Sequence, residues 1–197
     1  MARLPRPPAR VLEVGCGVEG GVTPALAAAG YAPLGIDPHA PEGPLFASIT
    51  LEELDDDGPF AAVVASRVLH HVDPLEPGLD KLARLAPLLL VDEFAPERID
   101  APTREWYEAQ HRLLVAAGAD PLGPSDLRDW AARHPDLHPS HVVLGKLDAR
   151  FETRYLEWRP YLYRWLGDPA TEELERGLID AGAIRALGFR YAGRVRK

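Results

Sequence analysis

A glycine-rich turn near the amino terminus is the feature of this sequence best suited to binding a ligand. The turn reads GCGVEGG at residues 15–21 and follows a short apolar run from Arg10 to Val14. Glycine lets the backbone approach a ligand closely, and the helix expected after the turn would present free amide hydrogens and a partial positive charge. We therefore expect a carboxylate or a phosphate to bind at this turn.

An acidic residue at the end of the next apolar run has the position of a ribose-binding carboxylate. Asp37 follows the run from Tyr31 to Ile36 and precedes Pro38, where a strand usually ends. It lies about 20 positions after the first glycine of the turn, and a carboxylate there can accept hydrogen bonds from both ribose hydroxyl groups. Together, the turn and Asp37 predict a cofactor that contains adenosine.

Two classes of cofactor fit this spacing. The turn satisfies the G-x-G-x-x-G pattern of nicotinamide and flavin dinucleotide sites, so an NAD(P)-dependent oxidoreductase is one alternative. Glu13 favours the other class, because a dinucleotide-binding strand normally keeps an apolar residue at this buried position. A carboxylate in that position is expected to have a cationic neighbour.

In these segments the sequence resembles class I S-adenosylmethionine-dependent methyltransferases, in particular the small-molecule, type 11-like members. Their first motif, an acidic residue followed by x-Gly-x-Gly, is matched by EVGCG at residues 13–17, and GID at residues 35–37 looks like their ribose-binding motif. The segment VVASRVLHHV at residues 63–72 is similar to the region after their fourth strand. LLLVDEF at residues 88–94 resembles their fifth strand and its exit. The resemblance covers residues 10 to 95 well and the remainder loosely.

The resemblance implies S-adenosylmethionine as the cofactor and direct displacement of its methyl group by an unidentified small-molecule acceptor. The glycine turn would bind the methionine part, Glu13 would act on its amino group through the loop, and Asp37 would bind the ribose. Glu52 is a weaker candidate near the adenine, and Ser66 and Arg67 would face the sulfonium and the substrate. The cofactor-binding residues implied in this way are Glu13, Gly15, Cys16, Gly17, Asp37, Pro38, Ser66 and Arg67.

Two residues are the candidates for a catalytic role. His71 follows the fourth expected strand, where a histidine can take a proton from a hydroxyl or amine at neutral pH. Glu93 lies where the fifth expected strand leaves the sheet, and it is a candidate for contact with the substrate. His70 is instead expected to hydrogen-bond the backbone at a helix start. Cys16 is expected to be a small residue beside the ligand, because no base is adjacent to it.

The elements that must position these residues alternate along the chain. Apolar runs predict strands, a period of three to four residues predicts helices, and their alternation predicts a parallel sheet whose strands all end at one edge. We therefore expect an α/β fold: a Rossmann-like, mostly parallel seven-stranded sheet with helices on both faces and a helical insertion after strand five. The strands are expected at 10–14, 31–36, 45–49, 60–65, 88–91, around 151–155 and at 189–195, and the helices at 23–29, 74–85, 103–117, 161–166 and 170–186.

The insertion carries most of what the cofactor motifs leave unexplained. We expect residues 1–197 to form a single domain, with 100–146 as a lid or substrate-side insertion that excludes water. Trp106, Tyr107 and His111 share one helix face and are expected to pack. His134, His138 and His141 are separated by prolines that interrupt any helix able to align them, so we predict a solvated loop and no metal site.

Composition restricts the possible partners and the compartment. The formal charge of −8 and the pI near 5.4 argue against a binder of nucleic acid, despite a basic carboxyl-terminal run. One cysteine and no apolar run long enough to cross a bilayer indicate a cytoplasmic protein that does not enter a membrane. The partner expected is a small-molecule methyl acceptor. A second alternative is a non-catalytic protein that binds S-adenosylmethionine, and the oligomeric state is left open.

Overall fold

The structure is a computed structural model that describes residues 4–55 and 58–196, and the chain divides into two compact units. The first unit contains residues 1–93, 141–157 and 190–197, and the second contains residues 94–140 and 158–189. The predicted insertion is therefore divided: 100–140 belongs to the second unit and 141–146 to the first. The residues predicted to bind the cofactor all belong to the first unit.

Seven strands form one sheet in the order β3-β2-β1-β4-β5-β7-β6. They are β1 (Arg10–Val14), β2 (Ala32–Ile36), β3 (Phe46–Ala47), β4 (Ala62–Ser66), β5 (Leu88–Phe94), β6 (Phe151–Arg159) and β7 (Gly188–Val195). Strand β1 pairs in parallel with β2 and β4, and β4 pairs in parallel with β5. Strand β7 runs antiparallel to β5, because Val195 N donates to Pro87 O at one end and Ala95 N donates to Leu187 O at the other. The predicted sheet is confirmed, and its parallel strands end at one edge.

Buried apolar residues explain why the central strands lie inside the sheet. Val11 and Leu12 of β1 and Ala62 and Val63 of β4 have no exposed surface. Strands covered on both faces have such continuous apolar runs. Glu13, also wholly buried, is the one charged residue in β1 after Arg10.

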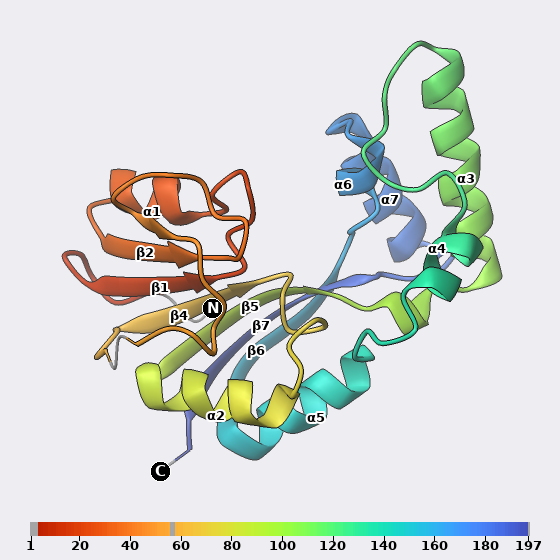
Figure 1. Cartoon of the computed structure of the whole chain (residues 1–197). Helices are drawn as coiled ribbons and strands as arrows, with labels where there is room; N and C mark the ends of the chain where they lie inside the picture. Colours follow the sequence, from red (N-terminus) through yellow and green to blue (C-terminus); the bar gives the residue numbers. More distant parts are fainter. Residues whose placement is uncertain (1–3, 56–57, 197) are drawn as a thin grey trace. The chain divides into compact units, whose positions relative to one another are not determined.

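The helices of the first unit are α1 (Thr23–Ala28), α2 (Leu75–Leu85) and α5 (Ser140–Arg150). Helix α1 lies on one face of the sheet, and α2 and α5 lie on the other (Figure 1). Helix α5 was not predicted from the sequence, because the prolines at 135 and 139 indicated a loop. Val143 and Leu147, four residues apart and both wholly buried, are the signal that would have revealed it.

The second unit packs helices around an aromatic core. Its elements are η1 (Pro96–Arg98), α3 (Ala101–Ala116), α4 (Leu127–Arg133), α6 (Tyr163–Leu166) and α7 (Ala170–Asp180). Phe94 stacks on Tyr161 with ring centroids 4.3 Å apart. Tyr107 is wholly buried and its hydroxyl donates to Pro124 O at 2.8 Å, while His111 is 8% exposed. Both residues therefore pack inside this unit, as expected from their shared helix face.

Two elements are shorter than predicted by three residues or more. The strand expected at 45–49 is reduced to Phe46 and Ala47. The helix expected at 170–186 ends at Asp180, because Gly182 adopts a φ of +69° and closes its last turn.

Candidate functional site

A buried carboxylate organises the glycine turn after β1. Glu13 has no exposed surface. Its carboxylate accepts hydrogen bonds from Thr23 N at 2.7 Å, Thr23 Oγ1 at 2.8 Å, Val22 N at 2.9 Å and Ser66 Oγ at 2.8 Å. The expected cationic neighbour is not found among these partners: neutral donors stabilise the carboxylate. Glu13 thereby ties the start of α1 to the end of β4.

These contacts change the expected role of the helix start. The amide hydrogens of Val22 and Thr23 were predicted to be free for a ligand, and in the structure they point at Glu13. A ligand phosphate at this place would have to displace a carboxylate that belongs to the protein. The arrangement therefore disfavours the binding of a dinucleotide pyrophosphate at the start of α1, which is where dinucleotide folds hold it.

Two positions of the turn require glycine, because other atoms leave no room for a Cβ there. Gly15 has a φ of +82°, and a Cβ built there would lie 2.7 Å from Ser66 O and from Val68 Cβ. Gly21 has a φ of +55°, and its Cβ would lie 2.3 Å from a Glu13 carboxylate oxygen. Any other residue at these positions would push the turn away from β4 or from Glu13.

Asp37 lies at the end of β2 and contacts the turn directly. Its Oδ2 accepts a hydrogen bond from Gly17 N at 3.1 Å, and its Oδ1 accepts one from His39 N at 2.8 Å. The side chain is 17% exposed. A carboxylate can accept about four hydrogen bonds. Asp37 therefore keeps capacity for the two hydroxyl groups of a ribose, so the residues present fit an adenosine cofactor.

Cys16 lies between these two acidic residues and is 2% exposed. Burial raises the pKa of its thiol to about 11, with further contributions from the negative charges of Glu13 and Asp37. The thiol is therefore protonated at neutral pH. A protonated, buried thiol is a poor nucleophile, which agrees with its expected role as a small residue beside the ligand.

Strand β4 ends in two residues of different character. Ser66 is 8% exposed and its hydroxyl is engaged with Glu13. Arg67 is exposed and has a φ of +54°, the one positive value for a residue other than glycine in the described ranges 4–55 and 58–196. This conformation costs about 1–2 kcal/mol for a residue with a side chain. Arg67 N donates to Asp92 O at 2.7 Å, which holds the strained corner against β5.

The acidic residue at the end of β5 faces inward. Glu93 is 1% exposed, and its carboxylate accepts a hydrogen bond from Leu69 N at 2.7 Å and lies 2.5 Å from His70 Nδ1. His70, which was expected to hydrogen-bond the backbone, therefore has a side-chain partner that the sequence did not predict. His71, which was predicted to act as a base, is exposed, and its ring centroid lies 4.2 Å from that of His70. The pair of His70 and Glu93 was missed because spacing does not reveal which of two adjacent histidines turns inward.

The remaining candidates have no such connections to the turn. Pro38 and Glu52 are both exposed, and Pro38 O accepts a hydrogen bond from Ser48 Oγ at 2.7 Å. His134 caps α4, with its Nδ1 2.7 Å from Trp130 O.

Within the described part of the chain, no three His, Cys, Asp or Glu residues gather in a way that could hold a metal ion. No helix among the described residues is both long enough and apolar enough to span a bilayer.

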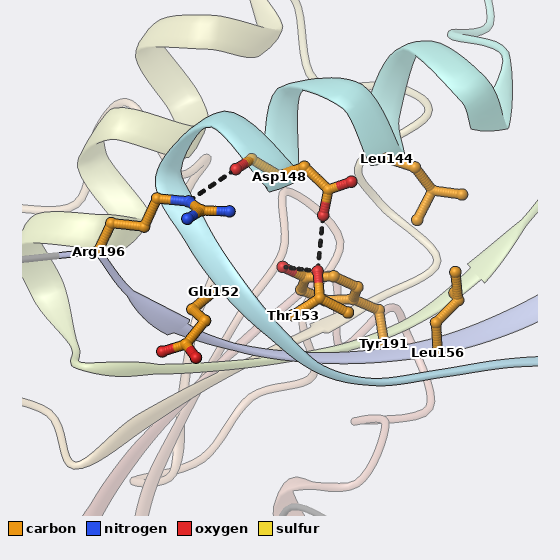
Figure 2. Close-up of a pocket in the computed structure, with 7 residues that line it drawn as sticks. All are labelled: Leu144, Asp148, Glu152, Thr153, Leu156, Tyr191 and Arg196. Atoms are coloured by element: carbon orange, nitrogen blue, oxygen red, sulfur yellow. Dashed lines mark hydrogen bonds between the residues drawn. The ribbon is translucent and has the colours of Figure 1, made fainter.

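A hollow of about 490 Å³ lies beside β6, the strand at one edge of the sheet (Figure 2). It is lined by Leu144, Asp148, Glu152, Thr153, Leu156, Tyr191 and Arg196. Thr153 Oγ1 donates to Asp148 Oδ1 at 2.6 Å. The residues come from α5, β6, β7 and the residue that follows β7. Strands β4 and β5 lie between β1 and this pair of strands in the sheet, so the hollow is away from the glycine turn.

The model of a family described as a methyltransferase domain matches residues 1–154 of the chain. No curated protein matches the sequence. Solved structures of similar fold include a protein from Listeria monocytogenes described as an S-adenosylmethionine-dependent methyltransferase, with 15% identity, a TM-score of 0.61, and coverage of 98% of this chain and 93% of that one. An S-adenosylmethionine-dependent methyltransferase from Mesorhizobium loti has 15% identity, a TM-score of 0.60, and coverage of 97% and 93%.

A third similar structure contains ligands. It is 1,6-didemethyltoxoflavin-N1-methyltransferase from Burkholderia thailandensis with bound 1,6-didemethyltoxoflavin and S-adenosylhomocysteine. The identity is 15%, the TM-score is 0.55, and the coverage is 96% of this chain and 72% of that one. At this identity the likeness establishes a shared fold.

Proposed function

The chain belongs to the methyltransferase domain family, and from this premise we propose that it transfers the methyl group of S-adenosylmethionine to a small-molecule acceptor. The methyl donor is the one named for the similar structures from Listeria monocytogenes and Mesorhizobium loti. The Burkholderia thailandensis enzyme holds a small acceptor together with the demethylated donor. These similarities support both the donor and the size class of the acceptor.

The observation that carries the proposal is the joint arrangement of Glu13 and Asp37 around the glycine turn. Glu13 occupies the start of α1, so the turn is not built for a pyrophosphate. Asp37 remains partly exposed beside Gly17, with capacity for ribose hydroxyls. No Lys or Arg stands between Arg10 and Arg67, whereas acidic residues recur through that stretch. The negative electrostatic potential of these residues attracts a cofactor that carries a sulfonium and an ammonium group, and it repels a diphosphate.

Each candidate residue has a role that its contacts support. Asp37 accepts hydrogen bonds from the ribose, and the backbone of Gly15 and Gly17 borders the methionine part. Glu13 does not touch the cofactor and holds the loop that does. Cys16 provides a small, uncharged side chain beside the ligand. Ser66, Pro38 and Arg67 complete the cofactor-binding set proposed from the sequence.

The chemistry requires alignment more than covalent participation. S-adenosylmethionine supplies an activated methyl group, whose bond to sulfur breaks as the acceptor forms its bond to the methyl carbon. The protein contributes by holding both partners in line and by excluding water. Where the acceptor is a hydroxyl or an amine, His71 is the group proposed to take its proton. Glu93 acts through His70 and holds the turn that carries His71, which makes Glu93 a positioning residue.

Transfer of labelled methyl groups tests this function. The purified protein would be incubated with S-adenosylmethionine labelled in the methyl group and a deproteinised cell extract as the source of acceptors. We expect label in a small molecule and formation of S-adenosylhomocysteine, and we expect Asp37→Ala to lose both. Label that enters only protein or nucleic acid would contradict the acceptor class. Formation of no S-adenosylhomocysteine would contradict methyl transfer.

A further inference from the structure

Arg67 is an isolated permanent cation in an acidic region. The loops that follow β1 and β2 contain Glu19, Asp37 and Glu42, and no Lys or Arg. Arg67 directly follows β4 and is exposed. Because the carboxyl ends of β1, β2 and β4 share one edge of the sheet, Arg67 brings a positive charge to the edge that carries the glycine turn.

The backbone at Arg67 carries a strain that a smaller residue would relieve. Its φ of +54° is tolerated far better by glycine or asparagine than by arginine. Its neighbours on each side supply Ser66 O and Val68 Cβ, the atoms nearest to a Cβ built on Gly15. The backbone at Arg67 therefore lies beside the turn, in a conformation to which its residue type is poorly suited. Strain of this kind concentrates at ligand-binding sites.

Arg67 has no ion-pair partner among residues 4–55 and 58–196, whereas three other arginines of the first unit do. Arg150 pairs with Asp80, Arg154 with Glu152 and Arg190 with Asp92. A guanidinium offers five donors in a planar arrangement that suits a carboxylate. The side chain is therefore available for an anionic group on a ligand.

The methionine part of the proposed cofactor carries such a group. Its ammonium and sulfonium are suited to the acidic surroundings, but its carboxylate requires donors or a positive charge. The start of α1 cannot provide them, because the amides of Val22 and Thr23 are bound to Glu13. We propose that Arg67 binds the carboxylate of the methionine part of the methyl donor. This inference rests on the proposed function and assigns one charged group of the donor to one residue.

A thermodynamic cycle by isothermal titration calorimetry tests the assignment. The ligands are S-adenosylhomocysteine and its decarboxylated analogue S-adenosyl-3-thiopropylamine, which lacks only the carboxylate. The proteins are the wild type, Arg67→Asn, and Arg84→Asn as a control. Asparagine tolerates the positive φ, so Arg67→Asn removes the charge without adding strain. Arg84 is an exposed arginine of α2, and its substitution changes the net charge by the same amount.

A charge-assisted contact of this kind is expected to change affinity by about 10-fold. Arg67→Asn should therefore weaken the binding of S-adenosylhomocysteine by about 10-fold and that of the decarboxylated analogue by less than about 2-fold. Arg84→Asn should leave both affinities unchanged. The inference is overturned if Arg67→Asn weakens both ligands equally or weakens neither. Wild-type protein that binds neither ligand would instead remove the proposed function, so the two failures are distinguishable.

Discussion

Removing the charge of Glu13 is expected to destabilise the first unit and to weaken cofactor binding, although Glu13 itself does not touch the cofactor. In Glu13→Gln the side chain keeps its shape, but one oxygen becomes an NH₂ group. That group cannot accept from Val22 N or Thr23 N, although it can donate to Ser66 Oγ. The substitution therefore replaces charge-assisted hydrogen bonds by neutral ones and places an NH₂ group opposite the N–H of Val22, which contacts both carboxylate oxygens.

The expected loss follows from these contacts. Hydrogen bonds to charged groups contribute about 1.5–3 kcal/mol each and neutral ones about 0.5–1.5 kcal/mol. Allowing for non-additivity within one network, we expect Glu13→Gln to lower the free energy of unfolding by about 2 kcal/mol. For a chain of this size the midpoint of thermal unfolding would fall by about 4–8 °C. The Kd of S-adenosylhomocysteine should rise because the turn is no longer fixed.

Thermal unfolding followed by circular dichroism, with and without S-adenosylhomocysteine, measures both effects. Glu105→Gln is the matched control, because Glu105 is an exposed residue of α3 and its substitution changes the charge by the same amount. Its effect on stability should stay within about 0.5 kcal/mol. If Glu13→Gln unfolds at the wild-type temperature, the role of Glu13 as the residue that holds the turn is refuted.

Three further predictions concern other residues. In urea unfolding, Gly15→Ala should lower the free energy of unfolding by about 3 kcal/mol and Gly17→Ala by about 1 kcal/mol. Both glycines have a positive φ, but an added Cβ meets other atoms only at Gly15. Equal losses would contradict this prediction. Burial raises the pKa of Glu175, so its stabilising contribution is complete below the unfolded pKa near 4.3 and falls as pH rises through the folded pKa. The stability of the wild type relative to Glu175→Gln, from urea unfolding at several pH values, should therefore decline above about pH 4.5, and a constant difference would contradict it. Cys16, with a pKa of about 11, should react with Ellman's reagent at pH 8 far more slowly in the native protein than in urea; equal rates would contradict its burial.

Local patterns predicted the first half of the fold because its elements are short and separated by clear turn signals. The strand at 10–14, the glycine turn and Asp37 depend on neighbours in sequence, and each lies where the sequence placed it. Helix α5 was missed because Pro139, which was interpreted as a helix breaker, immediately precedes its first residue. A proline can stand at a helix start without disrupting hydrogen bonds.

The partners of the buried acidic residues could not be predicted in the same way. Glu13 was expected near a cation, but five hydrogen bonds to its carboxylate come from neutral groups that the fold of the turn brings together. Which of His70 and His71 would meet Glu93 depends on the rotation of the chain after β4. That rotation is set by the positive φ of Arg67, for which the sequence carries no signal.

The most direct test of the account is a calorimetric comparison of S-adenosylhomocysteine with NADH on the ligand-free protein. We predict binding of one S-adenosylhomocysteine per chain, which Asp37→Ala abolishes, and no binding of NADH. Heat with NADH alone, or S-adenosylhomocysteine binding that Asp37→Ala leaves unchanged, would contradict the claim that the glycine turn and Asp37 hold the methyl donor.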